Sequence, residues 1–243
     1  MEIVSPMWWR VVAPAAGVMA ASLAWGALWP RSRWFGPVRW QGEVEGEPRR
    51  IGLLFECPGN GDCAIEVLRG LDRADAPAAF AVDLSAAVET PELLRRMHGA
   101  GHLLVNAGPV FAPANLFAGY PAWRRMIDQT EDAIHDVIGR RPLLFAPPHA
   151  IKSPVMLREA AWGGHGLVVR ARGQHLQLPR SWDTARLRRA PAAGIVALRA
   201  DQPRTIEQLP SLLDAWRGRG RWITRLDVLL NVPPYRRGVE PTL

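Results

Sequence analysis

The chain has 243 residues, 48% of them apolar, so it is long enough for one domain with a sizeable core plus a short appendage. The formal net charge of +7 suggests a nucleic-acid partner, but Lys152 is the single lysine and the arginines are scattered in pairs, without one basic run. We therefore expect no nucleic-acid partner, and since Cys57 and Cys63 are the only cysteines, no disulfide framework or zinc finger either.

An uncharged apolar segment lies near the start of the chain, at residues 11–30. Twenty helical residues at ~1.5 Å each are enough to span a bilayer, and tryptophans bracket the segment as they do at membrane interfaces. We predict that residues 1–30 form a membrane anchor or an uncleaved signal, with a single pass through the bacterial inner (cytoplasmic) membrane. A cleaved signal peptide and a helix that does not span are the alternatives.

The side of the membrane that holds the rest of the chain stays open. Arg31, Arg33 and Arg39 follow the segment and Arg10 precedes it, so the positive-inside rule favours a cytoplasmic domain. Enzymes that modify extracellular sugars lie on the other side, and the two arguments conflict.

Beyond a linker at residues 31–49, short apolar runs alternate with amphipathic stretches, and turns rich in Gly and Pro separate them. The alternation predicts an α/β fold with mainly parallel strands, but it does not distinguish an open sheet from a barrel. Strands are expected at residues 51–55, 78–82, 103–105, 143–145, 167–169, 194–198 and 222–224. Helices are expected at residues 63–71, 90–98, 121–138, 154–162 and 206–217, with Thr90 and Ser153 as N-caps.

Three sequence blocks then follow one another in a recognisable order. They are TPELLRRMHGAGH at residues 90–102, IGRRPLLFAPP at 138–148, and LPSLLDAW at 209–216 with WIT at 222–224. Together they resemble the polysaccharide deacetylase family, also known as the NodB-homology domain or carbohydrate esterase family 4. The resemblance implies an irregular (β/α)7-type barrel at residues 50–232, preceded by one N-terminal hydrophobic helix and followed by a tail at 233–243. The family's site lies at the carboxyl ends of the barrel strands.

The family resembled here consists of hydrolases that remove acetyl groups from N-acetylated sugars. One Asp acts as base, a second Asp and two His hold a divalent metal such as zinc, and a further His acts as acid. Carried over onto this chain, the base position is Glu56 and the metal-binding Asp position is Cys57. The two metal-binding His positions are Ala107 and Phe111.

Other family positions also differ. Ala146 replaces the arginine before the paired prolines, His149 replaces the tyrosine after them, and Arg199 replaces the late histidine. Because neither alanine nor phenylalanine can bind a metal, we predict a degenerate member with no metal site and no cofactor. It would be a membrane-tethered pseudoenzyme of carbohydrate and cell-envelope metabolism, whose partner is a glycan, a lipid-linked sugar or a cell-envelope protein.

Two alternatives stay open. In one, the protein is an active hydrolase on C–N bonds of an acylated sugar, with a site rewired around Glu56, Cys57 and His149, because a carboxylate remains and a thiolate can bind zinc. In the other, the arginines carry a basic module for membrane surfaces or nucleic acid. The other histidines are expected to be structural: His102 as a packing residue, and the rest at the surface or in loops, namely His98, His135, His165 and His175.

Overall fold

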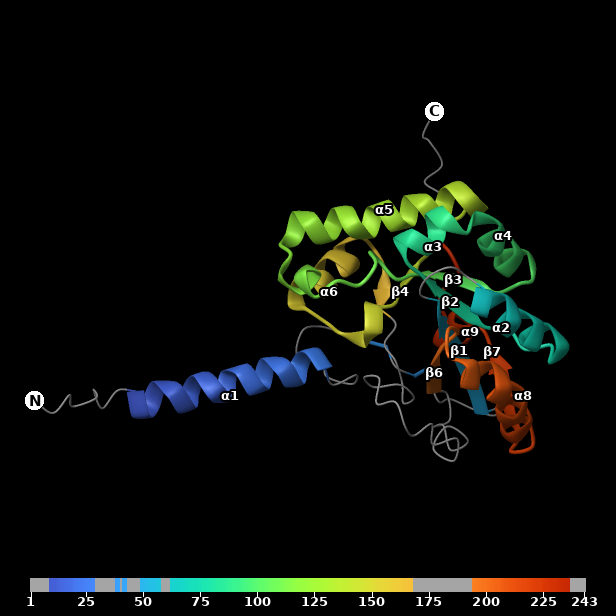
Figure 1. The fold of residues 1–243 in the computed structure, drawn as a ribbon, viewed down its shortest axis with the longest axis horizontal. Coiled ribbons are helices and arrows are strands. Elements are labelled where there is room, and N and C mark those ends of the chain that lie inside the picture. Colours follow the sequence, from blue (N-terminus) through green and yellow to red (C-terminus); the bar gives the residue numbers. More distant parts are fainter. Residues whose placement is uncertain are drawn as a thin grey trace, which may run out of the picture.

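The computed structural model describes residues 9–28, 38–39, 41–42, 49–57, 62–167 and 194–236. Helix α1 (Trp9–Leu28) precedes the domain, which confirms the expected N-terminal helix (Figure 1). In the described part of the chain, no helix combines the length and the apolar character that a bilayer crossing needs.

Seven parallel strands form one sheet, which curls into a half-barrel (Figure 1). The strand order is β5-β4-β3-β2-β1-β6, and β7 pairs with the first half of β1. The parallel pairing and the alternation with helices confirm the predicted fold class. The strands are β1 (Arg49–Glu56), β2 (Ala79–Val82), β3 (Leu103–Asn106), β4 (Leu144–Phe145), β5 (Gly166–Leu167), β6 (Gly194–Arg199) and β7 (Arg221–Thr224).

The helices follow the predicted order, with two additions. All five predicted helices are present, whereas α3 and α9 were not predicted because each is too short to show a helical period in the sequence. The helices are α2 (Asp62–Arg73), α3 (Leu84–Glu89), α4 (Pro91–Gly99), α5 (Tyr120–Ile138), α6 (Pro154–Trp162), α8 (Pro203–Arg217) and α9 (Leu226–Leu230), with short 3-10 turns η1 (Pro113–Phe117) and η2 (Pro148–Ala150).

The two predicted N-caps behave differently. The Ser153 hydroxyl accepts a hydrogen bond from the Met156 amide at 3.2 Å, as expected for the start of α6. Thr90 occupies the N-cap position of α4, but its hydroxyl donates to the Ala86 carbonyl at 2.8 Å. The prediction that Thr90 caps α4 is therefore wrong at the level of the side chain, because the unpredicted helix α3 offers its last turn as the partner.

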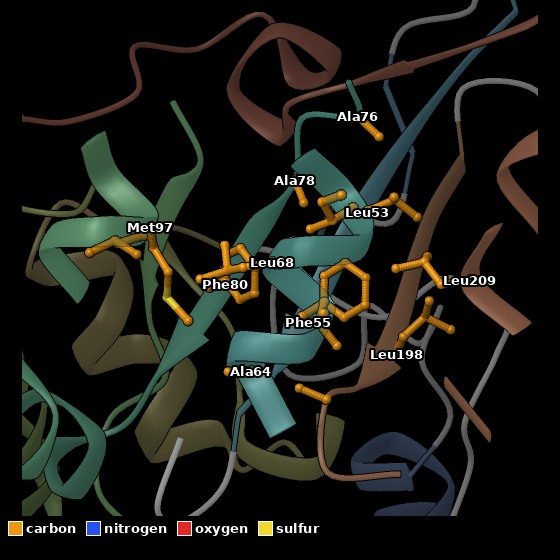
Figure 2. Close-up of a cluster of buried hydrophobic side chains, with 14 of the residues drawn as sticks. Leu53, Phe55, Ala64, Leu68, Ala76, Ala78, Phe80, Met97, Leu198 and Leu209 are labelled. Atoms are coloured by element: carbon orange, nitrogen blue, oxygen red, sulfur yellow. The ribbon is translucent and has the colours of Figure 1, made fainter. Parts of the chain in front are cut away.

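The outer face of the sheet packs under helices. Alternation along each strand sends Phe55 of β1 and Phe80 of β2 to this face, where their rings stack with centroids 5.5 Å apart. Leu68 of α2, Met97 of α4 and Leu209 of α8 belong to the same buried cluster (Figure 2). The cluster fixes the outer helices on the sheet.

The inner face of the sheet forms a second cluster, which α9 closes. Gly52 of β1 makes this approach possible, because a Cβ at that position would come within 2.4 Å of the Leu226 side chain. The sheet residues that face inward are small or medium in size and include Leu54, Ala79, Ala81, Leu103, Val105, Ala107, Leu144, Ala146, Ile195 and Ala197.

Candidate functional site

Two charged residues end neighbouring strands at the carboxyl edge of the sheet. Glu56 ends β1 and Arg199 ends β6, and the two residues are paired in the register of these strands. Glu56 and Arg199 lie two residues after the inward-facing Leu54 and Ala197, so alternation places their side chains on the inner face as well. The structure thus places the predicted base position beside the position of the family's late histidine.

The Arg199 guanidinium is held in an ionic network. Its Nε lies 2.8 Å from Asp201 Oδ1, and its side chain is only 12% exposed. The hydrogen bonds to Asp201 and, after them, the charges of Asp201 and Glu56 raise the pKa of Arg199 against the effect of burial. A guanidinium of this kind keeps its proton at every physiological pH and cannot act as a general acid.

At the end of β3, the side-chain amide of Asn106 holds the turn that carries Ala107. Asn106 is fully buried: its Nδ2 donates to the Ile127 carbonyl at 3.0 Å, and its Oδ1 accepts from the Gly108 amide at 2.7 Å. Gly108 adopts φ +73°, where a Cβ would meet the Phe145 ring at 3.3 Å. Asn106 therefore fixes a tight turn that presents Ala107, which is 8% exposed in the inner cluster.

Ala146 lies on the adjacent strand end. Its amide donates to the Asn106 carbonyl at 2.9 Å, and its side chain belongs to the same inner cluster as Ala107. Both methyl groups lack a donor atom, so this stretch of the inner face has apolar chemistry.

Phe111 and His149 meet across two loops. Their ring centroids are 4.7 Å apart, and the rings are nearly perpendicular. His149 is exposed and adopts φ +51°, a left-handed conformation within η2. Phe111 also lines a shallow, mainly apolar pocket with Pro109, Asn115, Leu116, Trp123, Pro148, Ile151 and Met156.

Cys57 has different surroundings. It packs against the outer cluster, whereas Ala107 belongs to the inner cluster and Phe111 contacts His149. Alternation after Glu56 turns Cys57 to the outer face, away from the inner cluster that includes Ala107.

The donor set does not fit a divalent metal. Among the residues that the structure describes, no three His, Cys, Asp or Glu side chains lie together in a group that could hold an ion. Glu56, Cys57 and His149 are all described and form no such group. Zinc sites in proteins use at least three protein ligands, so no chemical step is assigned to a metal here.

Two ionisable residues near this edge were not predicted as functional. Asp83 directly follows β2, its carboxylate caps α3 by accepting from the Ala86 amide at 2.8 Å, and burial raises its pKa. Lys152 follows η2 and is 1% exposed, and burial lowers its pKa to about 8. For Asp83, the position directly after a strand was a signal that the sequence offered.

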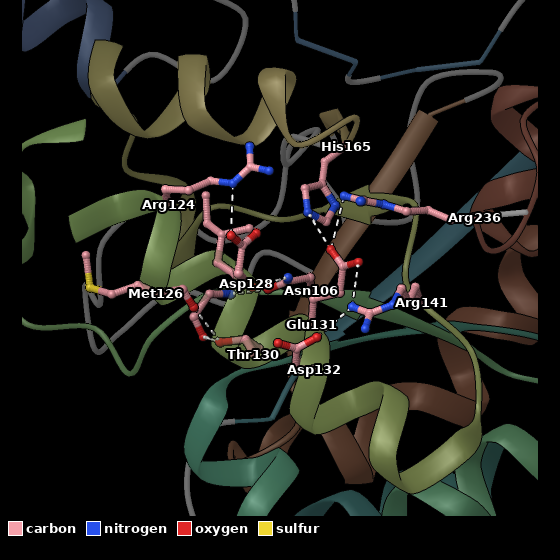
Figure 3. Close-up of polar contacts among 12 residues, drawn as sticks. Asn106, Arg124, Met126, Asp128, Thr130, Glu131, Asp132, Arg141, His165 and Arg236 are labelled. Atoms are coloured by element: carbon pink, nitrogen blue, oxygen red, sulfur yellow. Dashed lines mark hydrogen bonds and ion pairs between the residues drawn. The ribbon is translucent and has the colours of Figure 1, made fainter. Parts of the chain in front are cut away.

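A buried ionic cluster is centred on Glu131 of α5 (Figure 3). Glu131 of α5 lies 3.1 Å from His165 Nε2, 3.0 Å from an Arg236 nitrogen and 3.2 Å from an Arg141 nitrogen. Arg141 precedes β4 and His165 precedes β5, so the cluster belongs to the amino ends of these strands. It joins the end of the described chain to α5 and has no place in the candidate site.

Two further histidines in the described part of the chain, His102 and His165, have structural roles. His102 is buried, accepts from the Ala78 amide at 3.2 Å and packs against Phe80, which confirms its packing role. His165 lies in a loop as expected, but its side chain is fully buried because Glu131 is its partner. His175 lies outside the described residues.

Comparisons with known proteins agree with this geometry. A family model described as polysaccharide deacetylase matches residues 43–165. No curated protein matches the chain. Among solved structures, a family 4 carbohydrate esterase from Streptomyces lividans is 20% identical, with 73% of this chain and 92% of that chain covered and a TM-score of 0.66.

Two further solved structures are similar. A peptidoglycan N-acetylglucosamine deacetylase is 15% identical, covers 81% of this chain and 94% of its own, and has a TM-score of 0.69. A carbohydrate esterase family 4 pseudoenzyme from Bacillus anthracis is also 15% identical, covers 79% and 68%, and has a TM-score of 0.70. A mutant of that pseudoenzyme with restored enzymatic activity has also been solved.

At these identities the solved structures show a shared fold, and the family model spans half of the chain. The chain belongs to the polysaccharide deacetylase family.

Proposed function

We propose that the protein is a membrane-tethered, non-catalytic member of its family, which binds a glycan or lipid-linked sugar of the bacterial cell envelope. The proposal rests mainly on the replacement of both metal-binding histidines of the family by residues without a donor atom. Ala107 is a methyl group in the inner cluster, and Phe111 presents a ring to His149. Neither supplies an electron pair to a metal.

The chain also lacks the histidine that acts as general acid in the family's reaction. An amine leaving group needs a proton, and a histidine gives one readily near neutral pH. Arg199 stands at that position with its pKa raised by Asp201 and Glu56. Loss of both the metal ligands and the acid supports binding without hydrolysis.

A glycan is the class of ligand that the relatives support. One solved relative is a peptidoglycan N-acetylglucosamine deacetylase, and another deacetylase was solved with substrate. For this chain the membrane tether adds a preference for sugars held at the inner membrane. The tether itself is a proposal that rests on the uncharged residues 11–30.

One feature favours the second candidate, an active hydrolase rewired around Glu56, Cys57 and His149. Glu56 keeps a carboxylate on the inner face at the base position. Its neighbour in the register is Arg199, and the charge of Glu56 contributes to raising the pKa of that guanidinium.

Metal analysis and turnover of the purified full-length protein separate the two candidates. We expect far less than one zinc per chain and no release of acetate from N-acetylglucosamine oligomers, together with measurable binding of those oligomers. Stoichiometric zinc, with turnover that disappears in Glu56→Gln, would show that the non-catalytic proposal is wrong.

A further inference from the structure

Three exposed aromatic side chains and one arginine lie on the surface of η1, α5 and α6, and the arginine contacts two of the rings. Phe117 is 90% exposed, Trp162 is 64% exposed and Tyr120 is 43% exposed. The guanidinium carbon of Arg158 lies 5.2 Å from the centroid of the Tyr120 ring and 4.2 Å from that of Trp162. These four residues, named here the aromatic rim, form an apolar and cationic surface that no described part of the chain covers.

The charge around the aromatic rim is positive. Arg125 and Arg158 are exposed, whereas the single carboxylate of η1 and α6, Glu159, is buried. The first carboxylate along α5 is Asp128, which pairs with Arg124 at 2.9 Å. A partner of this surface therefore has to accept aromatic rings and to carry negative charge.

The chain from α1 enters the domain beside the same elements. Val38 is 4% exposed and packs with Trp123 of α5 and Met156 of α6. Residues 29–37 join it to α1, and a chain of that length reaches at most about 35 Å. In the view of Figure 1, α1 lies on the side of the domain that carries α6, away from α8.

Helix α1 exposes apolar side chains along its length. Val18 is 68% exposed, Met19 is 63% exposed and Leu23 is 48% exposed. This helix is joined to the domain next to the aromatic rim. A surface that covers the apolar side chains of α1 can therefore also reach the rim.

We propose that the aromatic rim docks on the surface of an anionic bilayer. The inference rests on the proposed membrane tether and adds the face that meets the lipid. Tryptophan and tyrosine favour the headgroup level, and arginine is attracted to anionic headgroups. An exposed apolar surface with basic neighbours is typical of such interfacial contacts.

Docking would set the direction of the candidate site. The shallow pocket of Phe111 includes Leu116 of η1 and Met156 of α6, which are elements of the docking face. The face of the domain that carries Phe111 then lies near the headgroup level.

Hydroxyl-radical footprinting of the full-length protein tests the docking face. The protein is compared in nanodiscs of phosphatidylcholine with phosphatidylglycerol and in neutral detergent micelles. We expect oxidation of Phe117 and Trp162 to be several-fold slower in the nanodiscs. Trp222 on β7, which is 66% exposed, is the matched reference and should react equally in both.

Variants sharpen the test. Phe117→Glu with Trp162→Glu should abolish the protection of Tyr120, whereas Val88→Glu with Trp222→Glu, at two other exposed apolar positions, should leave it intact. Trp162 reacting at the same rate in nanodiscs and micelles would overturn the docking, as would full protection in phosphatidylcholine alone. A protein partner or a soluble glycan as the occupant would produce the first of these results.

Flotation with vesicles of the same lipids separates this inference from the tether. A protein that floats while Trp162 stays reactive retains the tether and loses the docking face. A protein that does not float contradicts the tether itself.

Discussion

Asn106 and Ala107 are neighbours at the end of β3 and contribute to the candidate site in different ways. Asn106 is buried with both halves of its amide bonded, so it holds the turn that follows the strand. Ala107 is carried on that turn and has no donor atom. The proposed loss of metal binding therefore concerns the side chains alone, because the backbone turn that positions residue 107 is still held by Asn106.

Replacing Asn106 tests how strongly this turn depends on one amide. Asn106→Ala leaves the Gly108 amide and the Ile127 carbonyl without their partner inside the domain. We expect it to lower the free energy of unfolding by about 2 to 4 kcal/mol, since each unsatisfied buried group costs about 1 to 3 kcal/mol. Urea denaturation measures the change.

Asn115→Ala is the matched control for this substitution. The Asn115 amide donates to the Val110 carbonyl at 3.2 Å in an exposed setting, where water replaces it. We expect a loss of less than about 1 kcal/mol. Equal losses in the two variants would contradict the structural role assigned to Asn106.

The positions inferred to have lost metal ligands can be tested by restoring them. We expect Ala107→His and Phe111→His together to bring zinc to about one equivalent, because Ala107 shares the inner face at the carboxyl edge of the sheet with Glu56, whose carboxylate supplies a third ligand. The control carries Val110→His in place of Phe111→His, which moves the imidazole by one residue to an exposed position. Zinc retained after dialysis is the measurement, and equal binding by both variants would show that these positions are not the ligand positions.

At the scale of elements, the hydrophobic period predicted most of the secondary structure. β1 and α5 were foreseen because a buried strand reads as an apolar run and a long surface helix repeats its apolar face. α3 and α9 were missed because five or six residues do not complete two turns. The partner of Thr90 was missed for the same reason, since it belongs to α3.

The element α5 also carries the buried carboxylate Glu131, which no local pattern predicts. Its partners Arg141, His165 and Arg236 come from three other segments of the chain. Such a cluster depends on tertiary contacts between distant residues. From the sequence alone, an ordinary surface or loop role was therefore predicted for His165.

Glu131 gives the stability a defined pH dependence. Burial acts to raise its pKa, but the hydrogen bond and charge of His165, the charge of Arg236 and the hydrogen bond from Arg141 outweigh it, so the pKa lies below its ordinary value. A carboxyl whose pKa is lower in the folded state stabilises the fold above its unfolded pKa, and this contribution is lost as the pH falls through the folded pKa.

Glu131→Gln should therefore be destabilising at neutral pH and less so in acid. We expect a loss of about 3 kcal/mol at about pH 7, because the buried His165 and the Arg236 charge lose their partner, and the loss should shrink as the pH falls below the ordinary carboxyl pKa of 4.5. Asp132→Asn is the control, since Asp132 pairs with Arg141 but is 59% exposed. A loss in Glu131→Gln that is independent of pH would contradict the electrostatic role.

At the scale of the whole molecule, the sequence predicted the class of fold, and the family resemblance was needed to choose a barrel. Alternating strands and helices suit both an open sheet and a curled one. The pairing of Glu56 with Arg199 depends on the register of β1 with β6, which lie far apart in the chain. The sequence alone did not predict which of the candidate residues face one another, as the outward turn of Cys57 illustrates.

The proposed absence of a metal has a consequence for the stability of the whole domain. A protein that binds an ion only when folded is stabilised by it, by about 2.7 kcal/mol at an ion concentration of about 100 Kd. Because no described group of side chains holds an ion here, we expect the melting temperature of the native protein to be the same in excess zinc and in EDTA. Differential scanning fluorimetry makes the comparison, and the variant with restored ligands is the positive control, since zinc should raise its melting temperature. A fall in the melting temperature of the native protein in EDTA, reversed by zinc, would contradict the proposal and direct attention back to Glu56 and Cys57 as ligands.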